Sequence, residues 1–384
     1  MKRLLLVLLC GALAVGAQTA PAYRIATPGY HWHFPSTAPA RGHGGPQAGA
    51  SKSGTRGSAS VAAEHAPRTA PINDDAAHPA FANEWWYFTG NLHTAAGRRF
   101  GFELTFFRIS PAPGTDAAHD LYFTHFAISD IGGGQYLSRE RARRGNWQQA
   151  GVAATSAGLR LWNENWTADF DASGPRHLHA VWGQQSLDLA LVPGPRMLNG
   201  RDGWSQKGSA PGEASYYYSF PRMQATGMLQ AQAVTGVVWM DHEFATDQLG
   251  PHQQGWDWMG LHLPGGDLML FNLRQNNGSR DPHSAGTWKP LGGAPVPLDE
   301  ADFQMMPTRR WRGYPVAWRV QVPRLHLDFT VSAELDDQEF RAPAAGVTYW
   351  EGAVSLAGTR AGHEIHGEGY LELTGYGQRF NLLQ

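Results

Sequence analysis

From Glu84 onward, the chain alternates between apolar and other residues in short runs, the pattern of half-buried strands. In Arg99–Ser110 one face carries Phe100, Phe102, Leu104 and Phe106. Gly- and Pro-rich turns separate these runs, which predicts an all-β sandwich or barrel. The further predicted strands are 121–130, 159–162, 166–170, 177–182, 187–192, 216–220, 228–233, 236–240, 256–263, 268–274, 318–322, 325–332, 349–356 and 367–373.

The spacing of these runs predicts two β units of about 140–160 residues each. We place them at 73–245 and 246–384, because Gly250-Pro251 interrupts the pattern. Helical periodicity is weak and is best in Gln135–Gln149, where we expect a short helix. Residues 36–72 are rich in Ala, Gly, Ser, Pro and Arg and contain no aromatic residue, which indicates a low-complexity linker or insertion.

The first 17 residues have the features of a secretory signal peptide. Lys2 and Arg3 precede the apolar stretch Leu4–Val15, and small residues lead up to Ala17, after which we expect cleavage. Cys10, the only cysteine, lies inside this stretch, so we do not expect a lipid anchor. No later segment is long enough to span a bilayer. We therefore expect a soluble, periplasmic or secreted chain without disulfides.

Composition and charge narrow the function classes. Aromatic residues make up 11% and charged residues 17% of the 384 positions, so the chain has ample material for a core. The net charge of −2 excludes the electrostatic footprint of a nucleic-acid-binding protein. The densest basic run, Arg141–Arg144, is expected on a solvated surface. No nucleophile elbow, P-loop or dinucleotide fingerprint occurs, so we expect no cofactor.

Two pairs of closely spaced histidines are candidate metal ligands. His31 and His33 would share a strand face, whereas His363 and His366 would fall on opposite faces. Neither pair has an assignable third ligand, so we expect no metal.

The first polar constellation among large aromatic residues is His78–Tyr87. On a strand, Glu84 and Trp86 share one face with Phe88, and Trp85 and Tyr87 share the other. A carboxylate beside an indole in an apolar pocket has a raised pKa and can act as an acid. Alternatively, the aromatic residues are core and Glu84 caps the end of a barrel.

The second constellation is Trp239–Phe244. Asp241 and Glu243 would share a face with Trp239, and two close carboxylates split their pKa values so that one stays protonated near neutrality. His242 is then a candidate base or proton shuttle. The alternative is a turn of solvated polar residues.

The third constellation is Gly255–Gly260, where Trp256 and Trp258 share a face and Asp257 lies opposite. The paired indoles would either line a ligand site or fill a barrel core. The weaker candidates are Arg108, Tyr122, His125, Tyr216–Tyr218 and Arg222, with His125 expected to be a satisfied interior histidine.

These segments carry a resemblance to a known family. Asn83–Leu92, Tyr217–Arg222, Trp239–Phe244 and Gly255–Trp258 resemble the AttH-like secreted proteins, which are related to carotenoid 1,2-hydratase, and so do 349–352 and 369–376. The likeness spans about Phe34 to Tyr376. It implies two tandem lipocalin-like β units, a hydrophobic small-molecule ligand and association with an ABC export system. The chain departs from the hydratases at Phe244, where they tend to carry Trp, and in the insertion at 36–72.

The resemblance implies a cofactor-free hydro-lyase that adds water across a C=C bond. Asp241 would be the acid, His242 or Glu243 would position the water, and Glu84 would be a further catalytic carboxyl group. The π faces of Trp86, Trp239, Trp256 and Trp258 would stabilise the cation. Ligand contacts would also come from Tyr87, Asp257, Tyr218 and Arg222. The alternative is a non-catalytic carrier of an apolar ligand, and ester or amide hydrolysis ranks last.

Overall fold

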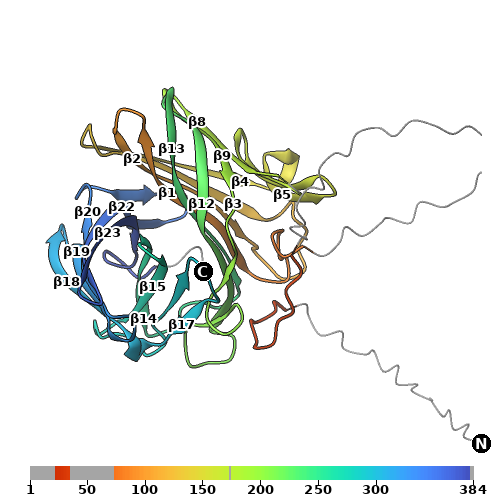
Figure 1. The fold of residues 1–384 in the computed structure, drawn as a ribbon. Helices are drawn as coiled ribbons and strands as arrows, with labels where there is room; N and C mark the ends of the chain where they lie inside the picture. The colour runs from red at the N-terminus through yellow and green to blue at the C-terminus, as the bar shows by residue number, and fades with distance from the viewer. Residues whose placement is uncertain (1–21, 35–72, 173, 381–384) are drawn as a thin grey trace, which may run out of the picture.

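The computed structural model describes residues 22–34, 73–172 and 174–380 (Figure 1). The expected signal peptide at 1–17, Cys10 and the low-complexity segment at 36–72 lie outside these residues. Among the described residues, no helix is long and apolar enough to cross a membrane.

The described chain folds into two antiparallel sheets. The 13 strands of the first sheet are β1 (Asn83–Thr94), β2 (Arg99–Ile109), β3 (Leu121–Asp130), β4 (Gln135–Arg144), β5 (Ala150–Thr155), β6 (Gly158–Asn163), β7 (Trp166–Asp171), β8 (Arg176–Trp182), β9 (Gln185–Val192), β10 (Met197–Leu198), β11 (Trp204–Gln206), β12 (Ala214–Leu229) and β13 (Gln232–Ala245).

The 10 strands of the second sheet are β14 (Gln253–Leu263), β15 (Gly266–Gln275), β16 (Ala285–Pro290), β17 (Val296–Leu298), β18 (Gln304–Trp311), β19 (Tyr314–Val322), β20 (Leu327–Ala333), β21 (Glu339–Ala342), β22 (Val347–Arg360) and β23 (His363–Leu373). Three single-turn 3₁₀ helices complete the described elements: η1 (Asn146–Gln148), η2 (Glu300–Asp302) and η3 (Pro323–Leu325).

The two sheets repeat one topology. In each, the first four strands form a meander, and the first strand also pairs with the last, β1 with β13 and β14 with β23. In Figure 1 the strands of the second sheet curve into a ring beside the first sheet. The prediction of an all-β fold with two tandem lipocalin-like units is confirmed. The unit limits at 73–245 and 246–384 stay a prediction.

Two expected elements were wrong. The segment 135–149 is not a helix: β4 pairs with β3 through residue 144, and only η1 follows. Pairing across the Gly132–Gly134 turn overrides the weak helical pattern. The expected strand at 228–233 is the tip of the β12–β13 hairpin, because Gln230 and Ala231 both have positive φ, of 47° and 61°. Neither residue type signals such a turn, which usually carries Gly or Asn.

Arg141 and Arg143 are not simply part of a solvated surface. Arg141 Nη1 donates to the carbonyl oxygen of Asn163 at 3.2 Å, and the Asn163 amide donates to that of Arg141. Arg143 pairs with Glu164. These contacts join β4 to the turn after β6, near the other edge of the same sheet, and help the sheet to close on itself.

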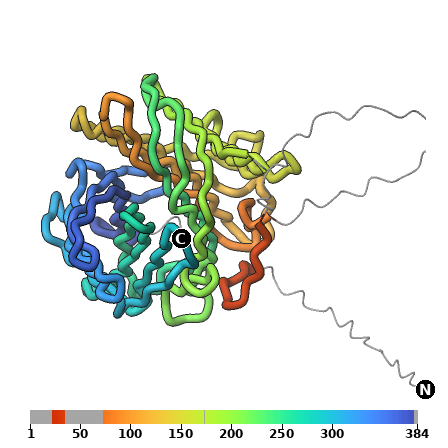
Figure 2. The backbone as a smooth tube through the Cα atoms, in the orientation of Figure 1, coloured from red at the N-terminus to blue at the C-terminus, as the bar shows by residue number. Residues whose placement is uncertain are grey.

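The N-terminal segment 22–34 crosses the end of the first sheet without forming a strand (Figure 2). Tyr23 donates to the carbonyl oxygen of Ser110 at 2.8 Å, and Trp32 Nε1 donates to that of Asp202 at 2.8 Å. This segment covers the end of the barrel where the ionisable groups described below are buried.

The strands between the two units are buried on both faces. On β2, Phe100, Phe102 and Leu104 point into the core of the first unit, while Gly101 and its alternates face the second sheet. A Cβ at Gly101 would lie 2.7 Å from the Cβ of Ala353, so only glycine permits this close approach of the sheets. Polar residues on these outer faces are therefore enclosed between the sheets rather than solvated.

Candidate functional site

The predicted site residues divide between the two faces of the paired strands β1 and β13. Glu84, Trp86 and His242 point into the first barrel. Trp85, Tyr87, Asp241 and Glu243 point toward the second sheet. The predicted face assignments on both strands are confirmed, and they create two separate regions with different chemistry.

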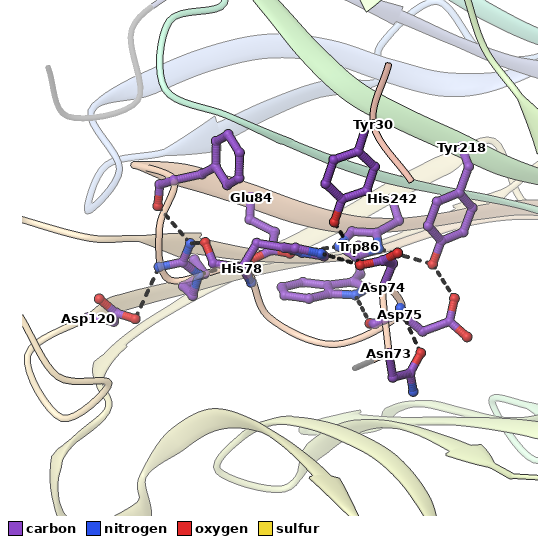
Figure 3. A network of polar contacts seen from close by, with 12 residues as sticks. Tyr30, Asn73, Asp74, Asp75, His78, Glu84, Trp86, Asp120, Tyr218 and His242 are labelled. Carbon is purple, nitrogen blue, oxygen red and sulfur yellow. Dashed lines mark hydrogen bonds and ion pairs between the residues drawn. The ribbon is translucent and has the colours of Figure 1, made fainter. Parts of the chain in front are cut away.

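The region inside the first barrel is centred on Glu84 (Figure 3). We call Glu84 and its partners the Glu84 network. Glu84 Oε1 accepts hydrogen bonds from His78 Nδ1 at 2.7 Å and from His242 Nε2 at 2.8 Å, and Oε2 accepts one from Arg108 Nε at 3.0 Å. Burial opposes ionisation of Glu84. The charge of His78 and the hydrogen bonds from both histidines outweigh burial and hold the pKa of Glu84 well below its ordinary value.

The Glu84 network extends through further polar partners. Arg108 also pairs with Asp120 at 3.2 Å, and Tyr218 donates to Asp75, which salt-bridges Arg196. Trp86 Nε1 donates to the carbonyl oxygen of Asp75 at 3.0 Å. Carboxylates thus alternate with cations and hydroxyl donors, so the charges of this buried network largely compensate one another.

Three of these residues, His78, Glu84 and His242, are close enough together to be considered as metal ligands. However, each histidine nitrogen lies only 2.7–2.8 Å from the same Glu84 oxygen. Neighbouring ligands of a tetrahedral zinc ion lie about 3.3 Å apart, from bond lengths near 2.0 Å. The distances fit a hydrogen-bonded ionic network better than a metal centre.

The second region is a pocket between the sheets, which we call the inter-sheet pocket. It encloses about 740 Å³ not occupied by protein atoms, its open mouth included. The lining residues are Trp85, Tyr87, Glu103, Thr105, Phe107, Lys207, Tyr217, Asp241, Glu243, Gln248, Leu249, Trp256, Trp258, Phe271, Leu273, Tyr349, Glu372 and Phe380. Apolar and aromatic walls with a few polar groups are typical of small-molecule sites.

Asp241 lies in this pocket without a cationic partner. Its Oδ1 accepts hydrogen bonds from Ser219 at 2.5 Å and from Trp239 Nε1 at 2.7 Å, and its Oδ2 accepts one from Tyr217 at 2.7 Å. Burial nevertheless raises the pKa of Asp241 to about 7, because these neutral donors do not offset the loss of water. The side chain therefore keeps its proton up to a much higher pH than an ordinary aspartate does.

Glu372 is a second carboxyl group of the pocket that has a raised pKa. Burial raises the pKa of Glu372 to about 8. Its Oε2 accepts a hydrogen bond from Trp256 Nε1 at 3.0 Å. Within the described chain, no protein group hydrogen-bonds to its Oε1. Burial also raises the pKa of Glu103, whose Oε2 has no partner among the described residues.

Glu243 is the pocket carboxylate that has a counter-charge. Lys207 Nζ lies 3.2 Å from Glu243 Oε1, and Ser215 donates to the same oxygen. The ammonium group also lies 4.0 Å from the centroid of the Phe271 ring. The pocket thus holds an ion pair next to acids whose pKa values are raised.

The structure brings together only part of the predicted site. Five predicted residues line the pocket, namely Tyr87, Asp241, Glu243, Trp256 and Trp258, and Trp239 bonds to Asp241. Four others belong to the Glu84 network or pack against it, namely Glu84, Trp86, Tyr218 and His242. Two lie elsewhere: Asp257 faces the second barrel and binds Arg274 and Tyr376, and Arg222 pairs with Asp267.

The sequence did not single out Glu103, Lys207, Glu372 or Tyr349 as pocket residues. Glu103 and Glu372 interrupt apolar strands, a usable signal, but Lys207 lies in a connecting segment with no pattern. The buried His125 donates to or accepts from Tyr349 at 2.6 Å and stacks on Phe340. This agrees with the expected interior role of His125, whose Nε2 lies 3.5 Å from Glu140 Oε1.

The chain is similar to a known protein family and to solved structures. A family model described as AttH-like matches residues 63–376. An AttH protein of Nitrosomonas europaea is 33% identical, with a TM-score of 0.71, and the match covers 82% of this chain and 99% of that one. A kievitone hydratase from Nectria haematococca is 14% identical, with a TM-score of 0.61 over 78% of this chain and 90% of that one, and shares the fold. No curated protein matches the chain. The chain belongs to the AttH-like family.

Proposed function

We propose that the inter-sheet pocket binds an apolar small molecule and hydrates one of its C=C bonds by acid catalysis, without a cofactor. The observation that carries this proposal is a pocket walled by indole and phenol rings in which burial raises the pKa values of two carboxyl groups, that of Asp241 to about 7 and that of Glu372 to about 8. Protonation of an alkene needs a neutral acid and a surface that tolerates a cation. The hydratase among the structural neighbours is consistent with this chemistry.

The geometry favours Glu372 over the expected Asp241 as the proton donor. All the described donors of Asp241 hold its two oxygens in place, whereas Glu372 has one oxygen free of protein partners. Transfer of the Glu372 proton to carbon forms a C–H bond and leaves a carbocation. The flanking rings of Trp256 and Trp258 then stabilise the positive charge.

Water completes the reaction. A water molecule attacks the cation and forms the C–O bond, and Glu243 takes the proton that this water loses. His242, the alternative water-positioning group, lies on the other face of β13 and bonds to Glu84. The π bond of the alkene breaks as the C–H and C–O bonds form. Exchange with solvent then returns a proton to Glu372 and removes the proton from Glu243, so the cycle closes without an oxidant or a reductant.

The test begins with the ligand that copurifies with the full chain from its own cells, identified by native mass spectrometry. Incubation in H₂¹⁸O should yield a product heavier by one labelled water. Glu372→Gln should slow this conversion by about 10²–10⁴-fold, as loss of a general acid does. Glu368→Gln, a matched change on the same strand at a carboxylate that pairs with His93, should leave the rate unchanged. Full turnover in Glu372→Gln would refute this assignment.

A carrier without catalysis is the second candidate. The hydrogen bonds that hold both oxygens of Asp241 favour it, because they are equally suited to a static binding wall. A copurified ligand that stays unchanged through prolonged incubation, and that exchanges with added ligand, would support the carrier and exclude the hydratase.

We also propose, on the sequence alone, that the chain is exported after cleavage of residues 1–17 and works beside an ABC export system. Sequencing of the mature protein from the periplasmic fraction should give an N-terminus at Gln18. A protein that retains Lys2 and Arg3 and remains in the cytoplasm would contradict this proposal.

A further inference from the structure

We propose that the inter-sheet pocket selects uncharged apolar ligands and rejects anionic ones, with a discrimination that grows as the pH rises. This inference rests on the proposed role of the pocket as a ligand site, but it does not depend on catalysis. It assigns the charge class of the ligand from the charges of the protein alone.

The pocket has an excess of acidic groups. Apart from three tyrosine hydroxyl groups, its ionisable lining consists of one ammonium group and four carboxyl groups, those of Lys207, Glu103, Asp241, Glu243 and Glu372. A fifth carboxyl group, Glu351, lies directly opposite Glu372 in the β22–β23 register and is fully buried. No arginine belongs to the described lining.

The ammonium group of Lys207, the single cation of the described lining, already pairs with Glu243. Lys207 Nζ lies 3.2 Å from Glu243 and 4.0 Å from the Phe271 ring centroid, and the side chain is buried. An anionic ligand could use this charge only by displacing Glu243, which would leave a buried carboxylate without a partner. Such a break of a buried pair is strongly unfavourable.

An anion in the pocket would therefore meet no free counter-charge. It would lose its hydration among the aromatic walls, and each pocket carboxyl group that ionises would repel it. An uncharged ligand meets the opposite situation. Trp85, Phe107 and Trp258 offer apolar surface, and the protonated carboxyl groups offer hydrogen bonds.

The discrimination depends on pH because the acids of the pocket ionise near neutrality. Asp241 on β13 has a pKa of about 7, and Glu372 on β23 has a pKa of about 8. Each adds one negative charge as the pH rises through these values. The titratable and charged groups that face them from the surrounding elements are Tyr87 on β1, Glu103 on β2, Lys207, Tyr217 on β12, Glu243 on β13, and Tyr349 and Glu351 on β22.

A matched pair of fluorescent probes tests the proposal on the full chain. N-phenyl-1-naphthylamine is uncharged, and 8-anilino-1-naphthalenesulfonate has the same ring skeleton with a sulfonate that stays ionised. At about pH 7.5 and constant ionic strength, the uncharged probe should bind at least about tenfold more tightly, since one uncompensated charge costs more than 1.4 kcal/mol. Between about pH 6 and pH 9 the affinity for the sulfonate should fall, and the affinity for the uncharged probe should stay constant.

Two tryptophan substitutions test whether the probes bind in the inter-sheet pocket. Leu249→Trp adds bulk to a lining residue and should weaken both probes, whereas Leu291→Trp, at an exposed leucine outside the lining, should weaken neither. Glu372→Gln removes one of the ionising groups and should flatten the pH dependence of sulfonate binding. Equal or tighter binding of the sulfonate, or a pH-independent ratio, would overturn the inference while leaving the pocket as a ligand site. If neither probe binds, this inference and the proposed ligand site both fail.

Discussion

Glu84 and Asp241 are both buried carboxyl groups on adjacent strands, β1 and β13, yet their surroundings shift their pKa values in opposite directions. Glu84 faces the first barrel, where His78, His242 and Arg108 surround it. Asp241 faces the inter-sheet pocket, where its partners are neutral donors. Burial alone would raise both pKa values. The comparison shows that nearby cations, and not burial, decide which acid stays ionised.

The difference also separates two roles. A charge-compensated network such as that of Glu84 gives a defined barrel end but leaves Glu84 without a proton to donate. An uncompensated acid such as Asp241 lowers stability once it ionises, and it keeps a proton available near neutrality. This contrast supports our proposal that the chemistry takes place in the pocket and that the Glu84 network is structural.

The largest expected effect is on stability. Glu84→Gln removes the charge between His78 and Arg108 and should lower the free energy of unfolding by about 3–5 kcal/mol, as breaking buried ion pairs does. Asp241→Asn at about pH 6 replaces an acid that is already mostly neutral and should cost less than about 1.5 kcal/mol. Urea unfolding of both variants measures the difference. An equal loss of unfolding free energy in the two variants would contradict the contrast between the two regions.

The second effect is on how stability depends on pH. The pKa of Asp241 is about 7 in the folded chain and near 4 when unfolded, so the folded state holds the extra proton between these values. Raising the pH through this window therefore destabilises the wild type. The unfolding free energy of Asp241→Asn relative to wild type should rise by up to about 1.4 kcal/mol per pH unit between about pH 5 and pH 7. A pH-independent difference would show that Asp241 ionises normally.

A smaller effect separates two neighbouring tyrosines. Tyr217 donates to Asp241, and Tyr218 donates to Asp75 in the other region. Tyr217→Phe removes a donor to the carboxylate and should raise the pKa of Asp241 by about one unit. Tyr218→Phe should leave that pKa unchanged while lowering stability. A carboxyl titration followed by ¹³C NMR distinguishes them, and a shift of the Asp241 pKa in both variants would mean that the regions are coupled.

The sequence predicts the fold well because strand alternation is local. It assigns Glu84 with Trp86, and Asp241 with Trp239, to the correct faces of their strands. It cannot show what lies opposite each face, so it merges Glu84 and His242 with Asp241 into one site. Only the packing of the second sheet against the first separates them.

Other parts of the site depend on contacts between distant segments. Glu372 reaches the pocket because β23 pairs with β14, the strand that carries Trp256 and Trp258. Lys207 reaches it because the segment between β11 and β12 packs against Glu243 on β13. No local pattern encodes either contact. The expected helix at 135–149 was wrong for the same reason, since pairing with β3 decides the conformation of β4.

The protonation of Asp241 in the folded chain is the measurement that tests this account most directly. With the aspartate carboxyl carbons labelled with ¹³C, the resonance that Asp241→Asn removes identifies the group. The account predicts that this resonance titrates with a midpoint of about pH 7. A midpoint near pH 4, the ordinary value for an aspartate, would contradict it.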